Sequence, residues 1–88
     1  MKFSVYLHPK AKESLDSLDA EDRVRVFACL RQLGDQPRKG RRLKLGSFRY
    51  VRAGDFRAIY EVNVQSRRVI VLYVGHRRNV CEEFGRWM

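Results

Sequence analysis

The sequence predicts a small α+β domain in which a mostly antiparallel sheet carries a helical hairpin on one face. Alternating polarity marks strands at the start of the chain and through its second half. Between them, apolar residues at helical spacing mark two consecutive helices. The 88 residues suit one domain, 1–88, with a single modest core. The order β-α-α-β-β-β, closed by a short C-terminal helix, is typical of the layered α+β class.

The first half of the chain predicts one strand and two helices. Alternating apolar residues predict a strand that ends at Leu7. Pro9 stands where a first helix would begin, because the first helical position tolerates its missing N–H. Asp19 is typical of the N-cap of a second helix, which Gly34 and Pro37 would end. The expected core-facing residues are Ala11, Leu15 and Leu18 in the first helix, and Val24, Val26, Phe27, Leu30 and Leu33 in the second.

The second half predicts a basic connector, three strands and a short helix. The connector, residues 38–44, shows little periodicity. Strands are expected at about 47–53, 56–63 and 68–74. The last of these is apolar on both faces, which favours a central place in the sheet, and Gly75 would break it. Residues 79–88 predict an amphipathic helix with Val80, Phe84 and Trp87 as packing residues.

The most informative segment is the hairpin predicted between residues 50 and 62. It reads as two alternating strands joined by a two-residue Gly54-Asp55 turn. This turn would place Arg52 directly opposite Arg57, and like charges that face each other across a ladder are unfavourable. A fold retains such a pair more readily where an anion binds. The hairpin therefore predicts a phosphate site.

Positive charge is concentrated in the second part of the chain. The protein has 19 Lys+Arg and 10 Asp+Glu, which give a formal net charge of +9. Residues 1–36 contain six basic and six acidic side chains, so residues 37–88 carry the whole excess, 13 basic against 4 acidic. Most of the basic residues are Arg, whose planar fork pairs bidentately with phosphate. A polyanionic partner is expected, with a merely solvated basic surface as the alternative.

Other classes find no support in the sequence. No apolar run approaches the roughly 20 residues that a membrane-spanning helix needs. The N-terminus alternates in polarity where a signal peptide would be apolar. Cys29 and Cys81 fit no metal or redox spacing, and Cys29 is expected in the core. We expect a cytoplasmic protein without metal or other cofactor.

Two motifs in this element order carry a family resemblance. One is the Arg-x-Gly-Asp-Phe-Arg-x-x-Tyr hairpin that begins at Arg52, preceded by Leu43-Lys44-Leu45-Gly46. The other is the Val-Gly-His-Arg-Arg segment that begins at Val74. Together they resemble the RelE/ParE superfamily of type II toxin–antitoxin toxins, and RelE-like mRNA interferases most of all. The resemblance implies a small toxin neutralised by a bound antitoxin. RelE-type members cleave mRNA in the ribosomal A site, whereas ParE-type members share the fold and poison DNA gyrase.

RNA cleavage by the 2′-hydroxyl needs a proton acceptor, positive charge over the developing phosphorane, and an acid for the leaving 5′-oxygen. The arginines, a nearby His and several tyrosines suit such metal-free chemistry. The resemblance assigns Arg52, Arg57 and Arg77 to phosphate binding and charge stabilisation, and His76 to acid–base catalysis. Further RNA contacts are expected from Lys44, Arg49, Tyr50, Arg41, Arg42 and Arg78.

Two positions depart from the family's pattern. Tyr50 stands at the first basic position of the family's strand, where Arg49 would substitute if the strand were bulged. Cys81 replaces the family's C-terminal tyrosine, and Phe84 can stack on a base but cannot donate a proton. Three functions stay open: a ribosome-dependent mRNA endoribonuclease, a ParE-like gyrase inhibitor, and a degenerate member that only binds nucleic acid or antitoxin. For His76, capping of the strand end is the alternative to catalysis.

The partners expected from the resemblance are a cognate antitoxin, the ribosome and mRNA. An acidic-leaning amphipathic segment of the antitoxin would lie along the helical hairpin or the sheet edge. There it would cover or displace the C-terminal helix and bury Phe84 and Trp87. The sequence leaves open whether the pair assembles as a heterotetramer.

Overall fold

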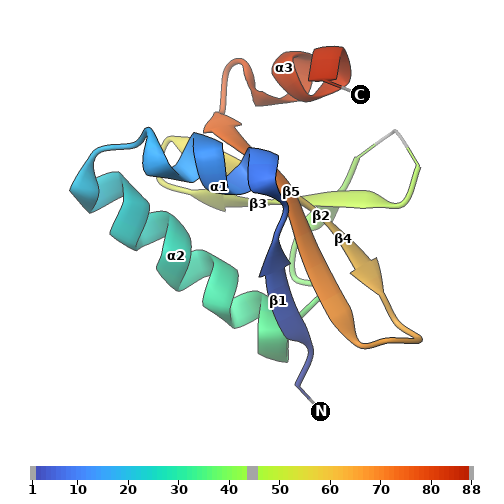
Figure 1. The fold of residues 1–88 in the computed structure, drawn as a ribbon. Coiled ribbons are helices and arrows are strands. Elements are labelled where there is room, and N and C mark those ends of the chain that lie inside the picture. The colour runs from blue at the N-terminus through green and yellow to red at the C-terminus, as the bar shows by residue number, and fades with distance from the viewer. Residues whose placement is uncertain (1, 44–45, 88) are drawn as a thin grey trace.

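Over residues 2–43 and 46–87, which the computed structural model describes, the chain forms three helices and a five-stranded sheet (Figure 1). This arrangement confirms the α+β class. In chain order the elements are β1 (Ser4–Leu7), α1 (Pro9–Asp16), α2 (Ala20–Asp35), β2 (Arg41–Arg42), β3 (Phe48–Ala53), β4 (Phe56–Asn63), β5 (Arg68–His76) and α3 (Val80–Trp87).

The strands lie in the order β1-β5-β4-β3-β2, with β1 parallel to β5 and the other neighbours antiparallel. β5 is an interior strand, flanked by β1 and β4, which suits its apolar sequence, and the middle strand of the five is β4. The sequence predicts only a connector with little periodicity over residues 38–44, but Arg41–Arg42 pair with β3 as the short edge strand β2. Gly75 does not break β5, which continues to His76. A Cβ on Gly75 would lie 3.1 Å from the Val80 side chain, so glycine here permits the close approach of α3.

One face of the sheet packs against α1 and α2, and we call it the α1–α2 face. Ala11 and Leu15 from α1 join Val26, Leu30 and Leu33 from α2 in one apolar cluster with the sheet. Two expected core residues are wrong, because Val24 and Phe27 are 69% and 37% exposed. The stripe at positions i, i+4 and i+7 that begins at Val26 faces the sheet, whereas Val24 and Phe27 lie outside it.

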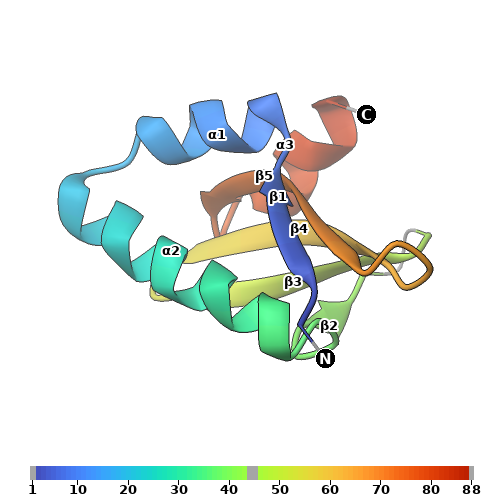
Figure 2. The ribbon, with the colours of Figure 1, turned by 60° about the horizontal axis from the view of Figure 1, so that its bottom comes forward.

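The opposite face, which we call the α3 face, packs against the C-terminal helix. Val80 and Phe84 bury Ile59 of β4 there, and Phe84 is only 1% exposed. The rings of Phe48 and Trp87 lie 5.2 and 5.7 Å from that of Phe84. In Figure 2, α2 lies nearest the viewer, the sheet behind it and α3 farther back, so the helices cover the sheet from two sides.

Candidate anion-binding site

The β3–β4 hairpin places two arginines against each other, as its turn sequence predicts. Arg52 pairs with Arg57, and Ala53 with Phe56, on either side of a two-residue turn. Gly54 in this turn has φ +61°, a backbone conformation that favours glycine. A two-residue turn closes on a hydrogen-bonded pair, so the next pair is the non-hydrogen-bonded kind, in which side chains approach most closely. The like charges of Arg52 and Arg57 are thus held at the least favourable position of the ladder.

Neither guanidinium of this pair is neutralised by a carboxylate within the described residues. Arg52 Nε donates to the carbonyl oxygen of Gly54 at 3.1 Å. The Arg57 guanidinium lies 4.8 Å from the ring centroid of Tyr50. Its buried Nε finds no hydrogen-bond acceptor in the part of the chain that the structure describes. A buried donor without an acceptor is costly, and an anion bound beside Arg57 would satisfy it.

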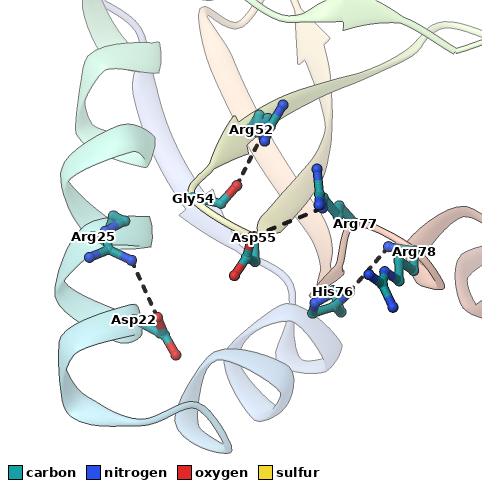
Figure 3. Close-up of polar contacts among 8 residues, drawn as sticks. All are labelled: Asp22, Arg25, Arg52, Gly54, Asp55, His76, Arg77 and Arg78. Carbon is teal, nitrogen blue, oxygen red and sulfur yellow. Dashed lines mark hydrogen bonds and ion pairs between the residues drawn. The ribbon is translucent and has the colours of Figure 1, made fainter.

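Two more arginines extend this charge across the sheet. Arg41 on β2 pairs with Tyr50, so it shares the α3 face with Arg52 and Arg57. Beyond β5, the Arg77 N–H donates to the carbonyl oxygen of Asp55 at 2.8 Å, and its guanidinium lies 4.0 Å from the Asp55 carboxylate. Figure 3 shows Arg77 beside the hairpin turn with this contact. We call Arg52, Arg57 and Arg77 the arginine row, and Arg41 on β2 flanks it at the sheet edge.

A pocket of about 390 Å³ opens at the edge of β3, where the two-residue β2 has ended. We call it the edge pocket. It is lined by Cys29, Lys39, Gly40, Arg41, Tyr50, Val51, Arg52 and Arg57. Four of these residues are cationic and none is acidic. Burial raises the pKa of the Cys29 thiol, while the charge of Lys39 acts in the opposite direction.

A buried tyrosine holds the loop that supplies one wall of the edge pocket. The Tyr60 hydroxyl donates to the carbonyl oxygen of Pro37 at 2.8 Å and accepts from the Gly40 N–H at 3.0 Å. A Cβ on Gly40 would lie 2.4 Å from the Tyr50 carbonyl oxygen, so only glycine lets the loop approach this closely. Burial raises the pKa of Tyr60, and the Gly40 hydrogen bond and Arg49 partly offset that shift. The sequence did not predict that Lys39, Gly40 and Tyr60 take part in the site. The one signal for them is a glycine, Gly40, within a run of basic residues.

The structure separates His76 from the arginine row. His76 pairs with Phe56, whose side chain packs toward the α1–α2 face, and the two rings lie 5.8 Å apart. Its Nδ1 accepts the Arg78 N–H at 3.3 Å, as Figure 3 shows. These contacts match the alternative in which His76 caps the strand end. Arg78 itself is exposed in the turn before α3.

Arg49 also lies away from the row. The β3–β4 register is regular from Phe48 to Ala53, so the bulge that would align Arg49 with Arg52 is absent from this described strand pair. Arg49 instead donates to the carbonyl oxygen of Gly40 at 2.9 Å and supports the loop. Arg42 pairs with Arg49 and is exposed. The expectation for Lys44 falls outside the described residues.

One carboxylate that the sequence reasoning did not single out lies on the α3 face. The Glu83 Oε1 is 3.1 Å from the position that a Cβ on Gly75 would take. Gly75 is the direct neighbour of Arg57 across β4 and β5. Glu83 is half-buried, and in the described part of the chain no cation lies within ion-pair distance of it. Its charge contributes, after burial, to a raised pKa of Tyr73.

The described residues provide neither a metal cluster nor a membrane span. Among them, no three His, Cys, Asp or Glu side chains gather as ligands for a metal ion. No helix over residues 2–43 and 46–87 is both long and apolar enough to cross a membrane.

Solved structures of small toxins share this fold. The RelBE2 toxin–antitoxin complex from Mycobacterium tuberculosis matches at 23% identity and TM-score 0.78, over 88% of this chain and 100% of that chain. The archaeal RelE–RelB complex from Pyrococcus horikoshii matches at 25% identity and TM-score 0.74, over 88% and 97%. The chromosomal ParDE system from P. aeruginosa matches at 15% identity and TM-score 0.68, over 85% and 96%. These matches show that the chain has the fold of the RelE- and ParE-type toxins.

A family model confirms this class from the sequence. The model for the ParE toxin of the type II toxin–antitoxin system parDE matches residues 5–80. The chain belongs to this family. A sequence comparison with curated proteins gave no match.

Proposed function

We propose that this toxin is a ribosome-dependent mRNA endoribonuclease whose arginine row binds the scissile phosphodiester. The observation that carries the proposal is the Arg52–Arg57 pair, held at close range without a neutralising carboxylate among the described residues. An arrangement that costs stability is retained where function requires it. The row combines fixed positive charge with a buried donor on Arg57, which are the features that stabilise a developing phosphorane.

In the proposed reaction the 2′-hydroxyl of the RNA attacks the adjacent phosphorus. Its proton passes to a base, a 2′,3′-cyclic phosphate forms, and the bond to the 5′-oxygen breaks as that oxygen gains a proton. Arg52 and Arg57 would hold the nonbridging oxygens, and Arg77, steered by Asp55, would approach from the end of β5. Tyr50, which lies beneath Arg57, would hold the guanidinium in place or stack on a base.

We assign the proton acceptor to Glu83 rather than His76. Glu83 lies on the α3 face above the neighbour of Arg57, whereas His76 packs with Phe56 on the other face. A carboxylate at this place can take the proton of an attacking hydroxyl. Glu83→Gln keeps the shape of the side chain but removes this base, and we expect cleavage to fall by about 100-fold or more. His76→Gln, which retains an acceptor near the Arg78 N–H, should lose far less; the reverse order of the two losses contradicts the assignment.

The test of the nuclease is primer extension on a defined mRNA translated in vitro. Cuts within A-site codons that need ribosomes support the proposal, and Arg57→Ala should abolish them while the protein stays folded. Arg68→Ala is a matched control, because Arg68 lies over Tyr6 at the far end of the sheet. Intact mRNA in the presence of folded wild-type protein contradicts the proposal.

Inhibition of DNA gyrase is a second candidate, and the match to the ParE toxin model favours it. The absence of an imidazole from the arginine row also fits a toxin that binds without cutting. A supercoiling assay with purified gyrase separates the two proposals. Inhibition that survives Arg57→Ala would support gyrase binding, whereas active gyrase together with cut mRNA would exclude it.

We further propose that an acidic-leaning amphipathic segment of an antitoxin neutralises the toxin. RelB partners accompany the RelE toxins in the solved complexes. Val24 and Phe27 offer exposed apolar surface on α2, next to Arg31, for such a segment. Phe84 is already buried by its own sheet, so an antitoxin reaches it only by displacing α3, whereas Trp87 is half-buried and more accessible. Val24→Asp should weaken antitoxin binding in a titration, with Arg68→Asp as the control; equal losses would contradict docking on α2.

A further inference from the structure

We propose that the edge pocket is a second phosphate subsite, which holds a phosphodiester next to the scissile one. This inference rests on the proposed RNA substrate but not on cleavage itself. The edge pocket shares Arg52 and Arg57 with the arginine row. An RNA backbone bound at the row therefore also runs next to the opening of the pocket. Lys39 and Arg41 then supply charge that the reacting phosphate does not need.

The size and lining of the edge pocket indicate its ligand. Its volume of about 390 Å³ falls within the range of small-ligand sites, about 300–1,000 Å³, which is room for a nucleotide unit. Such sites are usually apolar with a few polar groups, whereas half of the eight residues that line this one are cationic. The aromatic ring of Tyr50 is also in the lining. Cations beside an aromatic ring suit a phosphate with its attached base.

Backbone geometry adds a donor to this charge. The Leu43 N–H donates to the Phe48 carbonyl oxygen at 2.9 Å, so alternate residues of β3 direct their backbone groups toward the β2 edge. Every second residue from Phe48 is oriented in this way, so Arg52 is among them. Its carbonyl oxygen accepts from Cys29 Sγ at 3.6 Å. The Arg52 N–H points to the same edge, where β2 no longer covers it. Backbone N–H groups at such an edge are suited to bind an anion.

The loop that forms one wall is built to stay in place without a ligand. Tyr60 holds Pro37 and Gly40, Arg49 holds the Gly40 carbonyl oxygen, and Lys39 contacts the Gln32 side chain. A wall fixed in advance costs little ordering free energy when the ligand binds. The pocket is therefore preorganised for its ligand.

An added peptide strand is the competing occupant, and the edge disfavours it. β2 already covers Arg49 and Tyr50, and the turn begins at Gly54, so residues 51–53 are all that a new strand could pair with. Strands usually have 3–10 residues, and one carbonyl of this short stretch is already bonded to Cys29. A phosphate chain needs no such ladder.

The first test is binding of an uncleavable probe, a fluorescein-labelled 2′-O-methyl RNA hexanucleotide that lacks the attacking hydroxyl. We expect Lys39→Ala/Arg41→Ala to lower its affinity at least 10-fold in fluorescence anisotropy. The slope of log K against log salt should become shallower by about 1.4, because each phosphate contact to a single strand contributes about 0.7. Lys12→Ala/Arg31→Ala removes the same charge from exposed sites on α1 and α2 and should change affinity less than twofold. Equal losses in the two variants overturn the subsite.

The second test uses Cys29 as a reporter within the pocket. In the Cys81→Ser protein, the hexanucleotide should slow iodoacetamide modification of Cys29 at least fivefold. In the Cys29→Ser protein it should leave Cys81, which is exposed on α3, unprotected. Absence of Cys29 protection at saturating RNA overturns the subsite, and so does protection by a hexaglutamate peptide but not by RNA. Protection without mRNA cleavage contradicts the nuclease alone, whereas cleavage without protection contradicts the subsite alone.

Discussion

The two faces of the sheet differ in how completely they are covered and in what they leave exposed. On the α1–α2 face, two helices cover a mostly aliphatic cluster around Leu30, Leu33 and Val71. On the α3 face, a helix of eight residues covers the aromatic cluster around Phe84 and stops short of the arginine row. The α1–α2 face therefore mainly stabilises the fold, whereas the α3 face holds like charges together at some cost in stability. This separation allows the site to vary while the fold persists.

The largest expected effect comes from the uncovered end of the α3 face. Arg57→Ala should reduce mRNA cleavage by about 100-fold or more, because a preorganised donor to a developing charge typically contributes that much. Its free energy of unfolding should stay level or rise by up to about 1 kcal/mol, since a like-charge pair and an unsatisfied donor disappear. Urea denaturation measures the free energy of unfolding, and primer extension measures mRNA cleavage. A large loss of stability would mean that Arg57 belongs to the structural face after all.

The opposite pattern is expected on the α1–α2 face. Leu30→Ala should lower the free energy of unfolding by about 3 kcal/mol, as for other buried leucines, because α2 loses its contact with the sheet. Below the unfolding transition, affinity for the hexanucleotide should stay within a factor of about two. Urea denaturation and anisotropy on one preparation check this, and a parallel loss of RNA affinity would show that the two faces are coupled.

Gly40 links the two faces, and its substitution should damage both. Gly40→Ala places a Cβ against the Tyr50 carbonyl and the Tyr60 hydroxyl, and overpacking of this kind costs about 1–3 kcal/mol. We expect lower stability together with weaker hexanucleotide binding. Gly85→Ala is the control, because no atom lies within 4 Å of its added Cβ and alanine favours a helix by about 1 kcal/mol over glycine. A stable Gly40→Ala protein with normal RNA affinity would contradict the fixed loop.

The smallest expected effect is a difference in pH dependence, which concerns the Tyr60 hydroxyl. Tyr60→Phe leaves the Pro37 carbonyl and the Gly40 N–H without their partner, which costs about 1–3 kcal/mol. Burial raises the pKa of Tyr60, so the native state holds the phenolic proton more tightly than the unfolded chain does. This preference for the protonated phenol adds to the free energy of unfolding. The added stability is present in full below the ordinary tyrosine pKa, near 10, and is lost as pH rises above that value. The variant should therefore lose less stability than the wild type between about pH 8 and pH 10.5 in urea denaturation. If both proteins lose the same free energy of unfolding over this pH range, Tyr60 is not the group responsible for the pH dependence.

Local patterns determined much of this protein from the sequence alone. Polarity alternation and the Gly54-Asp55 turn set the register that opposes Arg52 to Arg57, because both act over a few neighbouring residues. Pro9 and Asp19 marked where the first two helices begin. Fold class, the order of all elements except β2, and the basic character of the second half followed from the same local information.

Only the tertiary structure decided which of these residues meet. Period two assigns a strand residue to one of two faces, but packing decides what covers each face, so His76 and Arg49 lie apart from the arginine row. The edge pocket joins α2, the loop at Lys39 and the β-hairpin, which are distant in the sequence. Its wall depends on a contact between Tyr60 and Gly40, 20 residues apart. Such long-range contacts form when the whole core packs, and local propensity carries no information about them.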